Sequence, residues 1–294
     1  MRIATKSDLH FNLPERKEIN SQLVEQINKS TADVLVIAGD FATGDFDKNY
    51  KPWLDRITYK GPKIAVPGNH DVWGQGELTM KRFLDFNTYM MKKGWHVLDD
   101  EPFVVDRVAF VGNMGWYDYS FFTNGDDKHD LEARKLSNAI GKQISRWSDL
   151  REYLPAKYIP NVYSWEDANK TNWGKDDPTV AHFFAQKLES DMKRIDKQCD
   201  KMVAVTHHLP FEELVMRAYN TKTEFSNAFR GSYSLGRVMR QNQKVDVAIC
   251  GHLHYPQYKK IGKINAHEVS LYEPEAYLKE IEVKGNALST MHER

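Results

Sequence analysis

Five short polar stretches hold most of the residues in this chain that could do chemistry. They carry carboxylate, amide and imidazole groups, and each follows an apolar run. The stretches are Asp8-Leu9-His10, Gly39-Asp40, Gly68-Asn69-His70-Asp71, His207-His208 and Gly251-His252-Leu253-His254. Glycine stands in several of them, where the backbone must turn sharply. Any one stretch is weak evidence, because a pattern such as Asp-x-His occurs by chance about once in a chain of this length.

Together, the stretches supply the donor atoms of a metal centre. Taken singly, Asp8 is better explained as a helix N-cap or a solvated loop carboxylate, and His10 as a surface or core histidine. The pair His252 and His254 is stronger, because alternate residues of an extended segment project to the same side. Mixed oxygen and nitrogen donors without a thiolate suit first-row transition metals such as Mn, Fe or Zn, of which we favour Mn.

This donor set also suggests a reaction. Two metal ions about 3.5 to 4 Å apart can activate a water molecule and hold the oxygens of an in-line displacement at phosphorus. One carboxylate that bridges the ions would let seven side chains serve both of them. Hydrolysis of a phosphate ester needs this arrangement, so the stretches predict a phosphohydrolase with two divalent transition metal ions.

The stretches must lie at strand ends for their side chains to meet. Strands are predicted at 2–6, 34–38, 63–66, 202–206 and 245–250, and each ends at one of the stretches. Helices are predicted at about 16–29, 48–57 and 77–91. This alternation predicts a largely parallel sheet with right-handed crossovers, whose carboxyl-end loops face one ligand crevice.

The remaining segments extend this α/β pattern. Segments 103–105 and 108–111 form a predicted antiparallel pair that turns at Asp106-Arg107, where we expect the sheet to continue as a mixed one. Segments 258–261, 264–269 and 276–283 are expected to form a terminal antiparallel set. Short helices are predicted at 212–217 and 235–241.

Residues 116–201 are the least regular part of the chain. Helices are predicted at 131–153 and 178–197, whereas 158–175 has the composition of a loop rich in aromatic residues and Asn. Because this region lacks a core pattern of its own, we expect an insertion or cap on a single domain that spans residues 1–294.

Composition argues against several classes of protein. Lys and Arg together number 41, as do Asp and Glu, so no net charge directs the chain to nucleic acid or to a membrane. No apolar run approaches the roughly 20 residues that cross a bilayer, and no leader-like segment precedes the first strand. Two cysteines are too few for a disulfide framework. We therefore expect a cytoplasmic protein, and the sequence indicates no oligomeric state.

The same stretches, in this order, resemble the successive sequence blocks of the calcineurin-like metallophosphoesterases. The residues concerned are Asp8-x-His10, Gly39-Asp40, Gly68-Asn69-His70-Asp71, His207 and Gly251-His252-x-His254. The resemblance implies an α/β fold, a four-layer α/β/β/α sandwich of two mixed sheets flanked by helices. It covers both ends of the chain but not the region 116–201, where family members differ.

The resemblance also implies a role for each residue. One ion would be held by Asp8, His10, Asp40 and His254, and the second by Asp40, Asn69, His207 and His252, with Asp40 as the bridge. His207 is preferred to His208, because the family's ligand directly follows the strand. His70 would lie over the leaving group, stabilise the pentavalent phosphorus and donate a proton to the departing oxygen. Asp71 or Asp45 would orient it.

Differences from other branches of the family favour a phosphodiesterase over a monoesterase. Phosphoprotein phosphatases of this fold carry an Arg soon after the second-block Asp and a Glu after the catalytic His. Here Phe41-Ala42-Thr43-Gly44 has no Arg and Asp71 replaces the Glu, which resembles the bacterial and phage phosphodiesterase-type branch.

That branch also has a Gly-Trp-Tyr-Asp loop after a strand. Trp116, Tyr117 and Asp118 are therefore candidates for the wall of a substrate pocket, and His208 is a further candidate substrate contact. Alternatively, Trp116 and Tyr119 simply pack beneath the insertion.

Two alternatives remain for the function. One is a nuclease, because a run of cations and rings could bind nucleic acid by charge and stacking. These residues are Lys135, Lys142, Arg146, Arg151, Tyr158, Tyr163, Trp165 and Trp173. Interleaved Asp and Glu residues dilute that charge, so a small phosphorylated or nucleotide substrate is favoured. The other alternative is a non-catalytic scaffold, which would have no reason to keep all seven donors together with His70.

Overall fold

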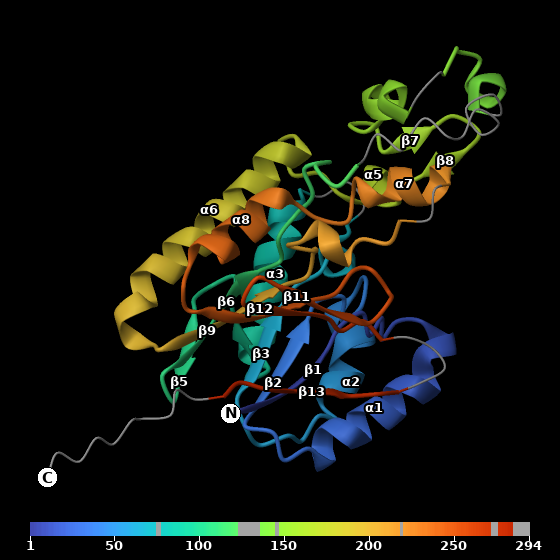
Figure 1. The fold of residues 1–294 in the computed structure, drawn as a ribbon. Helices are drawn as coiled ribbons and strands as arrows, with labels where there is room; N and C mark the ends of the chain where they lie inside the picture. The colour runs from blue at the N-terminus through green and yellow to red at the C-terminus, as the bar shows by residue number, and fades with distance from the viewer. Residues whose placement is uncertain (75–77, 123–135, 145–146, 218–219, 272–275, 285–294) are drawn as a thin grey trace, which may run out of the picture.

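Two large sheets form the centre of the molecule (Figure 1). The computed structural model describes residues 1–74, 78–122, 136–144, 147–217, 220–271 and 276–284. The first sheet contains, in spatial order, β13 (Lys279–Glu282), β1 (Arg2–Lys6), β2 (Val34–Ala38), β3 (Lys63–Val66) and β4 (His96–Val97). The second contains β11 (Gln257–Ile261), β12 (Ile264–Glu268), β10 (Val245–Cys250), β9 (Lys201–Thr206), β6 (Val108–Asn113) and β5 (Phe103–Val105).

The two sheets pack face to face, which explains why their central strands are apolar on both sides. One face of β2 places Val34 and Val36 in a buried cluster with Val203 of β9 and Ile249 of β10. Strands β1 to β4 are parallel to one another, as are β6, β9 and β10. The carboxyl-end loops of each parallel set therefore leave from one edge of its sheet.

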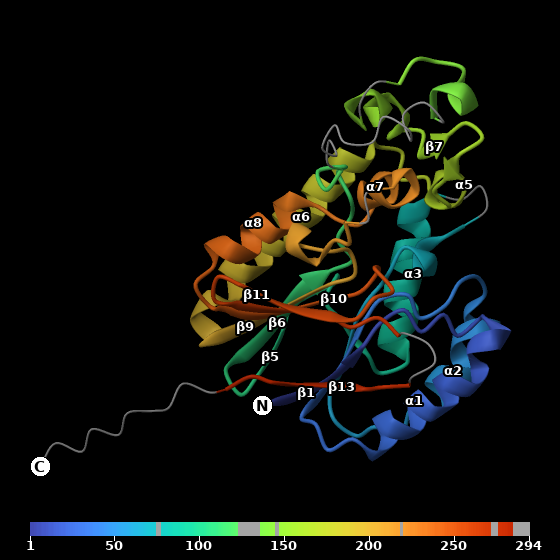
Figure 2. The same cartoon turned by 45° about the vertical axis from the view of Figure 1, so that its right-hand side comes forward.

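Helices cover the outer face of each sheet and complete the four layers (Figures 1 and 2). Against the first sheet lie α1 (Lys17–Lys29), α2 (Lys51–Leu54) and α3 (Thr79–Lys92), and against the second lie α6 (Asp177–Ile195) and α8 (Tyr233–Gln241). Helix α1 buries Leu23 and Ile27, which are four residues apart and so share one face. The expected sandwich of two mixed sheets flanked by helices is confirmed.

Short helices connect these layers. A π-helix, η2 (Phe46–Tyr50), leads into α2 where one helix over 48–57 was predicted. Among the 3₁₀ helices in the described residues are η1 (Pro14–Arg16), η3 (His70–Val72), η5 (Asp196–Gln198) and η6 (Glu212–Leu214). In the part of the chain that the structure describes, no helix is both long and apolar enough to cross a membrane.

Two expectations about strand pairing are wrong. The hairpin of β5 and β6 turns at Asp106-Arg107 as predicted, but it forms the edge of the second sheet and does not continue the first. The C-terminal strands are not one antiparallel set, because β12 pairs in parallel with β10 while β13 pairs with β1 in the other sheet. Pairing between distant strands depends on packing, and an apolar pattern does not specify the partner.

The region 116–201 also differs from its expected form. Residues 136–140 are helical and η4 (Trp147–Tyr153) is a 3₁₀ helix, where one helix over 131–153 was expected; part of that range lies outside the described residues. The expected loop at 158–175 contains a hairpin of β7 (Tyr158–Ile159) and β8 (Tyr163–Ser164), followed by α5 (Asp167–Lys170). Helix α6 covers the second sheet and so belongs to the sandwich.

This region has a core, contrary to expectation. Trp116, Tyr117 and Phe184 are buried in one aromatic cluster with Phe225 and Phe229. Phe225 lies on α7 (Thr221–Asn227), which the sequence did not predict. The views show β7, β8, α5 and α7 gathered at one end of the molecule (Figures 1 and 2). The rings come from distant segments at irregular spacing, so no periodic pattern marks this core in the sequence.

Candidate metal centre and active site

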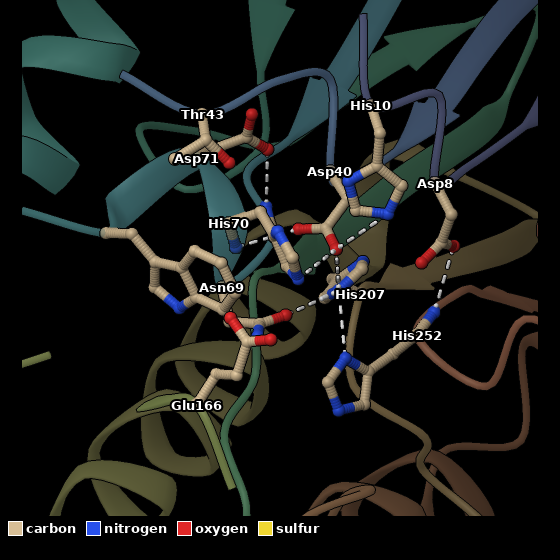
Figure 3. A network of polar contacts seen from close by, with 12 residues as sticks. Asp8, His10, Asp40, Thr43, Asn69, His70, Asp71, Glu166, His207 and His252 are labelled. Carbon is tan, nitrogen blue, oxygen red and sulfur yellow. Dashed lines mark hydrogen bonds and ion pairs between the residues drawn. The ribbon is translucent and has the colours of Figure 1, made fainter. Parts of the chain in front are cut away.

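The five polar stretches converge at the carboxyl ends of β1, β2, β3, β9 and β10, as predicted (Figure 3). Three of these strands belong to the first sheet and two to the second, so the site lies where the edges of the two sheets meet. Two groups of side chains each place their donor atoms within 4.8 Å of one another. The groups are Asp8, His10, Asp40 and His254, and Asp40, His207 and His252. Asp40 is common to both.

One carboxylate oxygen stands at the centre of these groups. Oδ2 of Asp40 is buried and makes no hydrogen bond. The Nε2 atoms of three imidazoles surround it, at 3.5 Å for His207, 3.7 Å for His10 and 3.9 Å for His70. Nε2 of His10 is likewise buried without a hydrogen-bond partner. Buried polar atoms are normally satisfied, so these two atoms indicate space for a bound cation.

Asn69 completes the second group. Its amide Oδ1 lies 3.1 Å from Nε2 of His207 and therefore faces the imidazoles. Its Nδ2 points the other way and donates to Asp167 at 3.0 Å. Nε2 of His254 lies 3.1 Å from Oδ1 of Asp8 at the opposite end of the site. All seven side chains expected to bind metal are thus brought together.

The backbone at these positions is unusual. Asp8, His10, Asp40, His252 and His254 have positive φ angles of 57°, 45°, 56°, 74° and 59°. This left-handed conformation costs a non-glycine residue roughly 1 to 2 kcal/mol, and such strain concentrates at functional sites. Its presence at five donors indicates that the fold holds the loops in conformations that aim their side chains at one point.

His70 lies at the mouth of the site, as does the donor His254. Its side chain is 27% exposed, and its ring packs against Trp73 and His10, with centroids 3.5 and 4.5 Å away. Its backbone N–H donates to Oδ1 of Asp40 at 2.9 Å. The loop that carries His70 is therefore fastened to Asp40, while the imidazole is free to face a ligand.

The Asp71 carboxylate, expected to orient the His70 imidazole, forms its hydrogen bonds with other groups. It accepts hydrogen bonds from the backbone N–H groups of Phe41, Ala42 and Gly68 and from the hydroxyl of Tyr50. Asp71 is buried and ties the loop after β2 to the loop after β3. The other expected partner, Asp45, instead caps η2 by accepting from the N–H of Lys48.

The electrostatics of the site favour a cation. Burial acts to raise the pKa of Asp40, but His207 and His70 outweigh it and hold that pKa below its usual value. Burial acts to lower the pKa of His207, but Asp40 and Asp8 outweigh it and raise the pKa to about 9. Burial lowers the pKa of His10 to about 3. A metal ion that binds here would displace the proton of His207, so binding is coupled to pH.

Two cavities open beside the site and share His70, Trp73, Glu166 and His254. The large cavity, of about 760 Å³, extends past His10 and includes the cations Arg16, Arg82 and Lys170. The small cavity, of about 310 Å³, extends past Asn69 and His252 and includes Tyr163, Trp165, Lys222 and Arg230. Sequence reasoning missed the three cations of the large cavity, because they lie in helices or the insertion and no motif marks them.

The expected aromatic pocket wall is not formed. Trp116, Tyr117 and His208 are fully buried and line neither cavity. The indole N–H of Trp116 donates to Asp177, and Nδ1 of His208 lies 3.2 Å from the carbonyl oxygen of Met114. Asp118 accepts from Ser232. The alternative, in which Trp116 packs beneath the insertion, describes the structure.

The rings proposed to bind nucleic acid also have packing partners. Trp165 stacks on Phe229, and the guanidinium of Arg230 lies over the Trp165 ring, 5.1 Å from its centroid. Trp173 packs against Phe83, Trp116 and Phe184. Lys142 pairs with Glu152. Lys135 and Arg146 lie outside the described residues.

Comparisons with known proteins agree with this geometry. The family model for calcineurin-like phosphoesterases matches residues 1–256. A phosphopantetheinyl hydrolase from Mycobacterium tuberculosis is similar in structure, with a TM-score of 0.66 and 20% identity over 95% of each chain. A dimetal phosphatase from Danio rerio has a TM-score of 0.51 and 14% identity, over 92% of this chain and 87% of that one. No match was found among curated proteins. The chain belongs to the calcineurin-like phosphoesterase family and is a metal-dependent hydrolase.

Proposed function

We propose that this protein is a dinuclear metal-dependent phosphodiesterase. Asp8, His10, Asp40 and His254 would hold one ion, and Asp40, Asn69, His207 and His252 the other. The unsatisfied Oδ2 of Asp40, with three imidazole nitrogens within 3.9 Å, carries this proposal, because Asp40 belongs to both donor groups and would bridge the two ions. The donors are hard oxygens and imidazoles, which fit Mn, Fe or Zn, and Mn is favoured.

The chain's own residues would perform the remaining chemistry. When bound, the two ions supply an activated water and stabilise the charge on the phosphate oxygens. His70 lies beside this position at the cavity mouth, where it would donate a proton to the departing oxygen. Oδ1 of Asp40 accepts a hydrogen bond from the backbone N–H of His70 and so holds in place the loop that carries this proton donor.

The two cavities support a diester as the substrate. A phosphodiester carries two substituents on one phosphorus, and a scissile phosphate at Asp40 would have space for one substituent on each side of His70. A monoester would fill only one cavity. Arg16, Arg82 and Lys170 bring three positive charges to the large cavity against the carboxylate of Glu166, which pairs with Lys170, so the lining favours an anionic substituent. We propose a single domain, in which the region after residue 116 shapes the small cavity through Tyr163 and Trp165.

A hydrolysis screen tests the proposal. The metal-free protein is supplemented with Mn²⁺, Fe²⁺ or Zn²⁺ and given a bis-aryl phosphate, an aryl phosphomonoester, a cyclic nucleotide, an oligonucleotide and a phosphopantetheinyl diester. The last is included because of the phosphopantetheinyl hydrolase with a similar fold. We expect a higher kcat/KM for a small diester than for the monoester.

His70→Asn should lower kcat by about 10²- to 10⁴-fold. The matched control is His182→Asn, because His182 is an exposed histidine on α6 that borders neither cavity. Preference for the monoester would contradict the diesterase, and preference for the oligonucleotide would favour the nuclease. No hydrolysis with any metal would favour the scaffold.

A further inference from the structure

Asp167 is a buried carboxylate at the start of α5, in the region 116–201 where the sequence offered no motif for the site. Both of its oxygens accept hydrogen bonds. Oδ1 accepts from Nδ2 of Asn69 at 3.0 Å and from the indole N–H of Trp73 at 2.6 Å. Oδ2 accepts from the indole N–H of Trp165 at 2.8 Å and the hydroxyl of Tyr117 at 3.1 Å. All four donors are neutral groups, and a buried carboxylate needs such donors to offset its desolvation.

The contact with Asn69 determines which way its amide points. An amide side chain has an oxygen on one side and an NH₂ group on the other, and the two can exchange places by rotation. A carboxylate can only accept, so Asp167 selects the orientation in which the NH₂ group of Asn69 faces it. The amide oxygen then faces His207 and the proposed second ion. Groups that fix a ligand in this way typically change metal affinity by about 10- to 100-fold.

Two further contacts extend from Asp167 to the site. Trp73, held through its N–H, packs against the imidazole of His70, with ring centroids 3.5 Å apart. Trp165, held through the other oxygen, lies edge to face with His252, at 5.7 Å between centroids. One side chain of the insertion thereby contacts a proposed metal ligand directly and supports the packing partners of His70 and His252.

We propose that Asp167 is a positioning residue that orients Asn69 toward the second metal ion. This inference rests on the proposed function, since it requires a second ion at Asn69. It assigns the insertion a role beyond covering the site, because Asp167 joins the insertion to the metal centre.

Calorimetric titration with Mn²⁺ tests the inference without relying on activity. The metal-free wild type should bind two ions. Asp167→Asn should weaken the second ion by about 10- to 100-fold and leave the first unchanged, because the first group does not contact Asp167.

Asp177→Asn is the matched control. Asp177 is also buried and also accepts from a Trp N–H and a Tyr hydroxyl, those of Trp116 and Tyr119. It differs in pairing with Lys157 at 2.8 Å, and it does not contact Asn69. Asp177→Asn should leave both affinities unchanged. Equal loss of affinity in Asp167→Asn and Asp177→Asn would overturn the inference.

A second pair of variants, made in an Asn69→Asp protein, tests whether Asp167 orients residue 69 or only supports the fold. In Asn69→Asp, two carboxylates would face each other where the amide now donates, so they would repel. Adding Asp167→Asn restores an N–H donor opposite the carboxylate introduced at position 69. Asp167→Asn should therefore lower the affinity for the second ion when residue 69 is Asn and raise that affinity when residue 69 is Asp. The same decrease in both backgrounds would mean that Asp167 only supports the fold.

If Asp167→Asn does not fold, Asn69→Asp alone decides the matter. A carboxylate is ordinarily the stronger ligand, yet the facing Asp167 should make the second ion bind more weakly than in the wild type. Tighter binding would overturn the inference. A wild type that binds fewer than two ions would instead contradict the proposed function, so the two failures are distinguishable.

Discussion

A Cβ atom on Gly68 would lie 2.1 Å from Oδ1 of Asp40, which is closer than two such atoms can approach. The loop after β3 can rest on the Asp40 carboxylate only because residue 68 has no side chain. Gly68→Ala should displace Asp40, and a shift of about 1 Å at such a group costs about 100-fold in rate. Activity and Mn²⁺ affinity should both fall in the folded variant.

Gly94→Ala is the control for this substitution. Gly94 has a φ of 78°, so alanine strains the backbone, but apart from the adjoining residues no atom of the described chain lies within 4 Å of the added Cβ. The Gly94→Ala variant should have a lower free energy of unfolding and an unchanged Mn²⁺ affinity. Unchanged affinity in Gly68→Ala would show that the loop can move without disturbing Asp40.

Asn69 and His70 are adjacent but should have separable functions. Asn69→Ala removes a proposed metal ligand and should weaken the second ion by more than about tenfold. His70→Asn should keep both ions and lower kcat by about 10²- to 10⁴-fold. Metal content by mass spectrometry and steady-state kinetics measure the two effects. Equal loss of metal in both variants would contradict this division.

Asp71 should act on stability more than on chemistry. In Asp71→Asn, an NH₂ group replaces one of the two oxygens that accept hydrogen bonds from Phe41, Ala42, Gly68 and Tyr50. The NH₂ group then faces other donors, which should lower the free energy of unfolding by about 2 to 4 kcal/mol. Tyr50→Phe removes one of these bonds and should cost about 1 kcal/mol. Urea unfolding measures both. A large loss of kcat with unchanged stability would instead support the catalytic role that the sequence predicted for Asp71.

Removing metal should destabilise the protein as well as inactivate it. Without an ion, Oδ2 of Asp40 and Nε2 of His10 are buried and unsatisfied. Mn²⁺ at 100 times its dissociation constant should add about 2.7 kcal/mol for one site. Thermal unfolding before and after treatment with a chelator measures this difference. An unchanged midpoint with Mn²⁺, Fe²⁺ and Zn²⁺ would contradict metal binding at this site.

Asp99 should make stability depend on pH. Burial raises the pKa of this carboxyl from 3.8 to about 7, and its Oδ2 has no hydrogen-bond partner. A raised folded-state pKa means that the unfolded chain releases its proton first, so stability is lost as pH rises from about 4 through about 7.

Asp99→Asn removes this effect. Relative to that variant, the wild type should lose about 2 to 3 kcal/mol of unfolding free energy between pH 5 and pH 7.5. Urea unfolding of the metal-free proteins at both pH values measures the difference. Parallel pH profiles would show that Asp99 is not protonated in the folded state at pH 5.

Local sequence was enough to predict the strands and their functional loops. In β1, β2, β3, β9 and β10, an apolar run is followed directly by donors, so strand and site residues were predicted together. Only the family resemblance assigned His70 a catalytic role in place of a metal-binding one. Where contacts come from distant segments, prediction failed. Trp116 and His208 look like pocket residues in a motif, yet the rings that bury them come from other parts of the chain.

The sequence by itself determined the expected donor set and the order of the loops, because each depends on neighbouring residues, whereas the four-layer architecture was expected from the family resemblance that these loops carry. Only the tertiary structure decided which sheet each hairpin joins, where the insertion's core lies, and that Asp71 binds backbone amides while Asp167 binds Asn69. These last contacts join residues far apart in the chain, and a side chain's partner depends on how the surrounding elements pack.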